Sequence, residues 1–189
     1  MNTRAAIHIA KLCGAVDPSV SGQTVYEAAV LGMSFELRLI YIANDDLTFV
    51  NQCTHQWDEY SAGMHREPYY SVALSDSGQT FIISLDHEPV CVAEVHHALQ
   101  YYVGEEFMPK EKDYLVRLFF ASALDLAVHS GVIQFFRGYC TRFTEVGGII
   151  IKADMHDETA LEQAGFSAKR TADGSHTGYY YYSTSKENE

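Results

Sequence analysis

The order of the expected elements predicts an α/β (α+β) fold with a mixed sheet. Strand-like segments follow Pro68, and the stretch after Pro109 reads as a long helix, a strand, a short helix and a final hairpin. Strands that alternate with helices in this order build a mixed sheet flanked by helices. Ahead of them, apolar residues near a helical period predict an N-terminal helical segment. We therefore expect a helical segment over residues 1–63 and a sheet domain over residues 64–189, which together can form one continuous domain.

The N-terminal segment is expected to be helical because its apolar residues recur near a 3.6-residue period. A candidate cap at Asn44-Asp45-Asp46 begins a second helix, and Gly63 is a plausible stop for it. Ala5–Cys13 is compatible with a further short helix. The residues that carry the period after Thr24 are Val25, Ala28, Ala29, Met33, Leu37 and Ile40.

Strands are expected after Pro68, where the apolar period changes to two. Tyr69–Leu74 and Thr80–Leu85 are separated by turn-forming residues, and a second turn precedes the alternating run Val90–Val103. That last run is long for one strand, so the sequence predicts a bulge or a break near His97–Ala98.

One long helix is expected over Asp113–Ser130. Its residues are almost all apolar and leave only a narrow polar stripe of Ser122, Asp125 and His129. A helix that is apolar all round is buried on most of its sides, as a helix packed on a sheet is. Gly131 is its expected stop.

The C-terminal third is expected to contain a short central strand, a short helix and a hairpin. The apolar strand is followed by a helix that an aspartate caps and that ends at Ala164-Gly165. Two strand-like runs then surround Asp173-Gly174, which is a strong hairpin signal. The expected segments are Gly148–Lys152, a helix begun by Asp154 or Asp157, Phe166–Thr171 and Thr177–Ser183.

The composition favours some partners over others. The chain has 189 residues and a net charge of −12, from 13 basic and 25 acidic residues. Such an acidic chain is a poor ligand for nucleic acid phosphates and for anionic membranes. Amines or basic proteins suit this charge better as partners, and the alternative interpretation is that the charge serves solubility alone.

The cysteines give no sign of a metal or redox site. The four cysteines are far apart and form no C-x-x-C pair, and Cys91 lies in an apolar run that predicts a buried free thiol. Met1–Leu12 is short and contains charged residues, so it does not read as a signal peptide. We therefore expect a cytoplasmic protein, microbial or of a host cell.

Two motifs and the order of the elements resemble the GNAT acyltransferases. Ala160–Phe166 resembles the family's helix that ends in a Gly-Phe step, and Phe107-Met108-Pro109 resembles its entry to the coenzyme A helix. The resemblance covers Tyr69–Ser183. It implies a mixed, mostly antiparallel central sheet flanked by helices, acetyl-CoA or another acyl-CoA as cofactor, no metal, and transfer of an acyl group to an amine.

The resemblance also implies where the cofactor binds. The family holds the pyrophosphate on backbone N–H groups at the start of the helix that follows Pro109, and its two glycine positions fall on Leu115 and Arg117. These larger residues narrow the phosphate cradle, and nearby lysines partly compensate. The expected cofactor-binding residues are Phe107, Met108, Lys110, Lys112, Asp113 and Tyr114.

Glu94 and His96 are the candidate catalytic bases. They lie two residues apart on the predicted strand and therefore share a face. The alternative interpretation is a half-exposed polar strand face without a catalytic role. The tyrosine with which the family often protonates the leaving thiolate falls on Leu161, and its asparagine falls on Asp154.

Two functions remain open at this point. The first is a divergent N-acyltransferase that acts on an amine of a small molecule or a protein. The second is a catalytically inactive domain that serves as a structural or interaction component, for example of a microbial or phage assembly. As a component of a phage assembly, the chain would be located in the virion. In the second case the partner is a protein or another copy of the chain. Neither function involves nucleic acid or a membrane.

Overall fold

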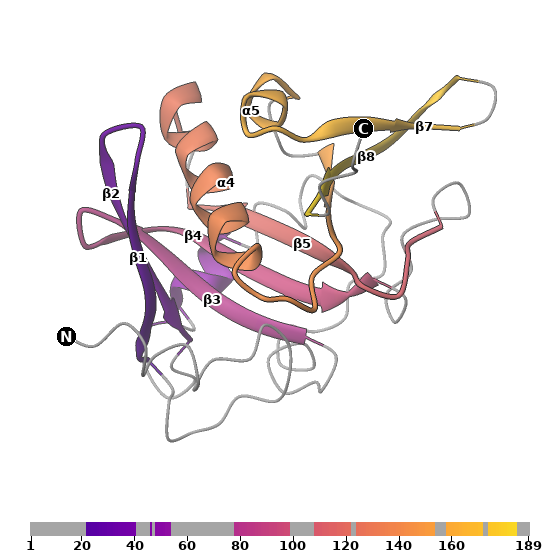
Figure 1. The fold of residues 1–189 in the computed structure, drawn as a ribbon. Coiled ribbons are helices and arrows are strands. Elements are labelled where there is room, and N and C mark those ends of the chain that lie inside the picture. Colours follow the sequence, from indigo (N-terminus) through magenta and orange to yellow (C-terminus); the bar gives the residue numbers. More distant parts are fainter. Residues whose placement is uncertain are drawn as a thin grey trace. The chain divides into compact units, whose positions relative to one another are not determined.

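The computed structural model describes residues 22–40, 46, 48–53, 78–98, 108–121, 124–153, 158–171 and 174–184. Within them, eight strands form a sheet in the order β1-β2-β3-β4-β5-β6-β8-β7. β5 and β6 are parallel, whereas β1–β2, β2–β3, β6–β8 and β7–β8 are antiparallel. The predicted fold class is therefore confirmed (Figure 1). The elements are β1 (Thr24–Val30), β2 (Met33–Leu39), β3 (Gly78–Leu85), β4 (Glu88–His97), β5 (Asp113–Phe120), α4 (Leu126–Cys140), β6 (Gly148–Lys152), α5 (Glu158–Gln163), β7 (Ser167–Arg170) and β8 (His176–Ser183).

The chain divides into two compact units. Unit 1 comprises Met1–Glu94 and Leu118–Leu124, and unit 2 comprises Val95–Arg117 and Asp125–Glu189. β4 and β5 thus contribute residues to both units. The predicted boundary at Gly63 lies outside the described residues.

In unit 1, the prediction of a helix after Thr24 is wrong, because β1 and β2 form an antiparallel hairpin there. Leu31 and Gly32 form its turn with φ angles of 53° and 78°, and such left-handed pairs match the twist of a two-residue hairpin. Phe35, Leu37 and Leu39 are buried, and the residues between them are polar. This alternation with a period of two is typical of a strand. Gly32 lies in the turn of the hairpin and is not an unfavourable residue inside a helix.

The core of unit 1 gathers apolar residues from strands and from a helical stretch. Residues 48–53 are helical, which agrees with the helix predicted after Asn44, whereas its continuation towards Gly63 lies outside the described residues. The predictions for Ala5–Cys13 and Tyr69–Leu74 lie outside them too. The core residues are Ile40, Val50, Cys53, Val92 and Phe119.

Cys91 is a buried free thiol, as predicted. Burial raises the pKa of Cys91 well above its usual range, and it raises the pKa of the Cys53 thiol to about 12. Both thiols therefore stay protonated at neutral pH, which makes them apolar core groups rather than nucleophiles.

The prediction of one helix over Asp113–Ser130 is wrong. β5 occupies its first half, and α4 begins only at Leu126, so that Gly131 lies buried inside a helix that it was expected to end. β5 is buried on both faces and hydrogen-bonds to β6 in parallel. A strand buried on both faces reads as a continuous apolar run, and periodicity cannot distinguish such a run from a buried helix.

The short strand, the short helix and the hairpin predicted for the end of the chain are confirmed, whereas the aspartate predicted to cap the helix, Asp154 or Asp157, lies outside the described residues. β6 spans the predicted residues, α5 ends before Ala164-Gly165, and β7 and β8 form the expected antiparallel hairpin (Figure 1). α4 and α5 are joined by a hydrogen bond of 2.9 Å from the Ser130 hydroxyl to Gln163. Leu115, Ile150 and Ala98 form a core cluster against which Tyr179 and Tyr181 pack.

Candidate functional site

The two candidate bases lie on β4, and the side chains of both are buried. Glu94 is 0% exposed and His96 is 3% exposed. They are two residues apart on a regular strand, so they share a face as predicted, and the strand ends at His97 where a break was expected. The expected half-exposure of this face is therefore wrong, whereas the catalytic role of the two residues and its absence both stay predictions. Because burying ionisable groups costs free energy, such groups are more common at functional sites than in ordinary cores.

The residues predicted to start the cofactor-binding helix lie instead at the beginning of strand β5. Leu115 and Arg117 were matched to phosphate-binding glycines, yet both lie within the strand, where Leu115 pairs with Ile150 of β6. The prediction that a phosphate-binding helix begins near these residues is therefore wrong, because they lie in a strand and not at a helix start. Contact of the neighbouring side chains with a ligand stays a prediction.

The predicted cofactor-binding side chains differ widely in exposure. Met108 is 84% exposed, whereas Tyr114 is buried with its ring centroid 4.7 Å from that of His97. Lys110 and Lys112 are exposed and belong to the turn that leads into β5. Phe107 lies outside the described residues.

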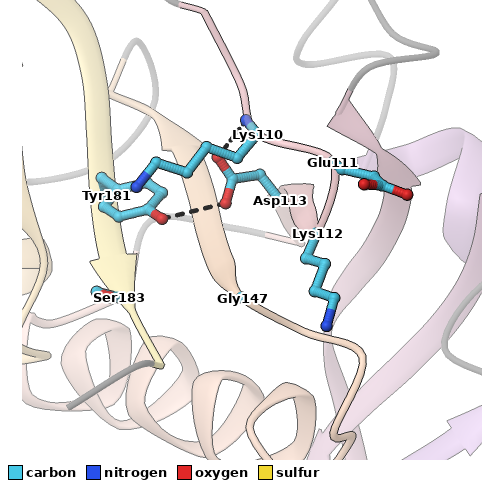
Figure 2. A pocket seen from close by; sticks show the side chains of 7 residues that line it. All are labelled: Lys110, Glu111, Lys112, Asp113, Gly147, Tyr181 and Ser183. Carbon is cyan, nitrogen blue, oxygen red and sulfur yellow. Dashed lines mark hydrogen bonds between the residues drawn. The ribbon is translucent and has the colours of Figure 1, made fainter. Parts of the chain in front are cut away.

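A pocket of about 290 Å³ lies where β5, β6 and β8 meet (Figure 2). Asp113 lies at its base with only 2% exposure. One of its carboxylate oxygens accepts the backbone N–H of Lys110 at 2.8 Å, and the other accepts the hydroxyl of Tyr181 at 3.1 Å. Three predicted residues, Lys110, Lys112 and Asp113, thus come together here, and Tyr181 joins them without having been predicted. The full lining is Lys110, Glu111, Lys112, Asp113, Gly147, Tyr181 and Ser183.

The contact between Asp113 and Tyr181 depends on Gly148. Gly148 pairs with Asp113 on one side and with Ser183 on the other, so the Tyr181 side chain crosses it diagonally. A Cβ atom at Gly148 would lie 2.2 Å from the Tyr181 hydroxyl oxygen and 2.5 Å from the Asp113 carboxylate. A glycine at the first residue of a strand was the only sequence signal of this close approach.

The lysine side chains around the pocket do not all point into it. In Figure 2 the Lys110 side chain extends towards Tyr181, whereas Lys112 points away from it. The ammonium of Lys169 lies 4.2 Å from the centroid of the Tyr181 ring, which is a cation–π distance. Since both oxygens of Asp113 already accept hydrogen bonds, the group is best suited to fixing the three strands together.

The start of α4 is the place where a diphosphate would bind by general physics, because helix N-termini attract anions. Asp125 is its N-cap, and its carboxylate accepts the N–H of Val128 at 2.9 Å. A diphosphate would have to displace this carboxylate and would meet its like charge. No glycine and no lysine or arginine lies in the described stretch from Leu124 to Val128. This helix start therefore does not fit the diphosphate of coenzyme A.

The C-terminal elements offer no acid in the position that the resemblance implies. Leu161 is buried in α5, and Asp154 lies outside the described residues. The Tyr180 hydroxyl donates a hydrogen bond to Glu158 at 3.0 Å. Burial, reinforced by that hydrogen bond, raises the pKa of Tyr180 to about 12, so Tyr180 holds its proton firmly.

The described residues contain neither a grouping of side chains that could hold a metal ion nor a helix that could cross a membrane. In this part of the chain, no three or more His, Cys, Asp and Glu side chains are grouped so that they could hold a metal ion. Its helices are also all too short or too polar to cross a membrane.

Comparison with known proteins gives structural matches only. No protein-family model and no curated protein sequence matches the chain. The aminoglycoside acetyltransferase AAC(6')-Ib in complex with coenzyme A is 18% identical, with a TM-score of 0.60 over 79% of this chain and 95% of that one. RimJ of Mycobacterium smegmatis, in complex with CoA-disulfide, is 12% identical, with a TM-score of 0.56 over 89% and 90%.

A third match extends the same architecture to another protein. The GNAT domain of S. lividans PAT is 15% identical, with a TM-score of 0.55 over 83% of this chain and 96% of that domain. At such low identity the likeness concerns the fold. The chain has the GNAT acyltransferase fold.

Proposed function

We propose that this chain transfers an acyl group from a thioester to an amine. The support is the fold together with two buried ionisable side chains on β4. Solved structures of AAC(6')-Ib, which share this fold, hold coenzyme A together with kanamycin or with ribostamycin. Aminoglycosides carry amino groups, so an amine on a small molecule is the first acceptor to test, and an amine on a protein is the second.

Glu94 carries this proposal, because acyl transfer to an amine needs a group that takes up the amine's proton. An amine is protonated at neutral pH and attacks a thioester only after it loses a proton. In the reaction the C–N bond forms, the C–S bond breaks, and the leaving thiolate takes up a proton. The Glu94 carboxylate is fully buried and accepts the amine's proton, and His96 on the same strand face is the second candidate for this role.

The test is an acyl-transfer assay on the purified chain. Acetyl-CoA and acetyl-pantetheine are offered with kanamycin, a polyamine and a peptide with a free N-terminus, and the products are detected by mass spectrometry. We expect multiple turnovers with at least one acceptor. Glu94→Gln then lowers kcat/KM by about 100-fold, the order expected for loss of a general base. Glu88→Gln is the matched control, since Glu88 is an exposed glutamate on the same strand.

Each outcome of this assay decides something. Absence of turnover with every donor and acceptor contradicts acyl transfer. If Glu94→Gln keeps its turnover and His96→Ala loses it, His96 is the base. If both variants keep full activity, neither β4 residue is the base. His87→Asn is the control for the histidine, because His87 is exposed and already lies in a left-handed conformation.

A second candidate function is a non-catalytic binding or structural component. Two observations favour it: the carboxylate at the start of α4 and the apolar Leu161 where the resemblance implies an acid. In this case the chain isolated from its source forms a defined oligomer or a stoichiometric complex, measured by light scattering, and turns over no thioester. A monomer that transfers acyl groups would exclude this function.

A further inference from the structure

Asp125 lies at the start of α4, where a helix attracts anions. α4 has 15 residues, more than any other described helix, and the aligned peptide dipoles make its start electropositive. The Asp125 carboxylate occupies this start by accepting the N–H of Val128 at 2.9 Å. The chain's own anion thus holds the place that a ligand's phosphate would take.

The surroundings on α4 add a second obstacle for a phosphate. Asp125 is exposed and Leu126 is 41% exposed, so a ligand that approaches from solvent meets the carboxylate and an apolar side chain. Within α4 the arginine of the last turn, Arg137, donates to the carbonyl of Ala164 and lies 4.9 Å from the Tyr182 ring centroid. The first turn of α4 contains no lysine or arginine that would offset the charge of a bound diphosphate, and its only ionisable side chain is that of His129.

We propose that Asp125 is a specificity-determining residue that makes binding of the acyl donor independent of a diphosphate group. The inference rests on the proposed acyl transfer. A thioester of pantetheine, which has no diphosphate, binds as tightly as the corresponding thioester of coenzyme A. The donors for which the chain is suited are therefore acyl thioesters recognised through their acyl and pantetheine parts.

The expected size of the effect follows from the charges. Asn keeps the N-cap hydrogen bond and has nearly the shape of Asp, so Asp125→Asn removes only the negative charge. Because Asp125 is exposed, its charge is screened almost as in bulk water, where two unit charges about 4 Å apart repel enough to change a binding constant by about five- to tenfold. Asp125→Asn is therefore expected to tighten binding of coenzyme A by about tenfold and to leave pantetheine unchanged.

The first arm of the test measures dissociation constants of coenzyme A and pantetheine by isothermal titration. The original chain is expected to bind both within about threefold of each other, and Asp125→Asn to favour coenzyme A by about tenfold. Glu145→Gln is the matched control, because it removes one exposed carboxylate elsewhere in unit 2. The proposal is overturned if the original chain already prefers coenzyme A by tenfold or more and Asp125→Asn leaves that preference unchanged.

The second arm separates this inference from the proposed function. Inorganic pyrophosphate is titrated while the amide resonances of Leu126, Ala127 and Val128 are followed by NMR. Asp125→Asn is expected to bind it about tenfold more tightly than the original chain and Glu145→Gln do. If neither coenzyme A nor pantetheine binds in the first arm, the proposed acyl transfer is contradicted. The pyrophosphate titration alone then decides whether Asp125 repels phosphate. Equal binding of pyrophosphate by all three proteins overturns the role of Asp125.

Discussion

Two aspartates of unit 2 show how the same side chain takes different roles in different places. Asp113 is buried at the junction of β5, β6 and β8, and both of its carboxylate oxygens accept hydrogen bonds. Asp125 is exposed at the start of α4 and accepts a single hydrogen bond from its own helix. The first connects residues 68 positions apart, whereas the second reaches only three positions along the chain.

These two environments determine which of the two carboxylates contributes more to the stability of the fold. Removing a partner from a buried carboxylate leaves an unsatisfied charge, which costs more than the hydrogen bond itself contributed. Removing an exposed N-cap costs only about 1 kcal/mol, because water satisfies the freed N–H group. We therefore expect changes at the Asp113 junction to affect stability, and changes at Asp125 to affect mainly which anions the chain binds.

The largest effect is expected from Gly148→Ala, which places a methyl group inside the Asp113–Tyr181 contact. The new Cβ would lie 2.2 Å from the Tyr181 hydroxyl oxygen, so the ring or the strand must move. Overpacking together with loss of the hydrogen bond is expected to lower the free energy of unfolding by about 3 kcal/mol. Equilibrium urea denaturation measures it.

The control for this prediction is a double-mutant cycle with Tyr181→Ala. Truncating the tyrosine removes the atoms that the new methyl group would meet, so the double variant should lose less stability than the sum of the two single variants. Strict additivity would mean that the cost of Gly148→Ala comes from the backbone and not from the contact.

The next effect concerns the opposite face of β8, where Tyr180 connects the strand to the start of α5 through Glu158. Burial raises the pKa of Tyr180 to about 12 from its ordinary value of 10.0, so the folded state favours the protonated form. The resulting stability is complete below pH 10 and is lost as the pH rises towards 12. The loss is at most about 2–3 kcal/mol.

Tyr180→Phe checks this pH dependence, because it removes the titrating group and keeps the ring. The difference in free energy of unfolding between the original chain and Tyr180→Phe is to be measured by urea denaturation at pH 9 and again near pH 12. We expect the original chain to lose stability relative to the variant over this interval. A difference that stays constant across the interval would contradict the raised pKa.

Tyr181→Phe is expected to have a smaller effect, about 1–2 kcal/mol, because it removes one of the two hydrogen bonds to Asp113 and keeps the packing of the ring. Tyr182→Phe is the matched control on the other face of β8, where the ring packs 5.6 Å from that of Phe166. Thermal and urea unfolding of both variants measure the difference. Equal losses in the two would show that the Asp113 junction is not special.

The sequence predicts the fold class and the C-terminal elements well, since these depend on local signals. Gly148–Lys152 is a short apolar run between turn residues, and Asp173-Gly174 between two strand-like runs marks a hairpin. The prediction from the sequence is wrong at β5, because this strand is buried on both faces and lacks the apolar–polar alternation by which strands are recognised. That single error also placed the expected phosphate-binding residues at the start of a strand.

The candidate site is less predictable, because its contacts join distant residues. Glu94 and His96 follow from strand alternation, but their complete burial depends on neighbouring elements that no local pattern reveals. Asp113 was identified as a residue close to a ligand, whereas its bond to Tyr181 needs the register of three strands. Asp125 was read as a position on a helix face, and only the true start of α4 makes it an N-cap.

The smallest effect on stability is expected at Asp125. Asp125→Ala removes the N-cap of α4 and should lower the free energy of unfolding by about 1 kcal/mol, while Asp125→Asn should change it by no more than a few tenths, because Asn caps a helix almost as well. Urea denaturation of both variants at neutral pH and moderate salt measures the two values. Since the charge of Asp125 sits at the positive end of a helix dipole, any small loss in Asp125→Asn should shrink further at high salt. If Asp125→Asn instead destabilises the chain as much as Gly148→Ala does, the carboxylate is a structural group like Asp113, and the contrast between the two aspartates fails.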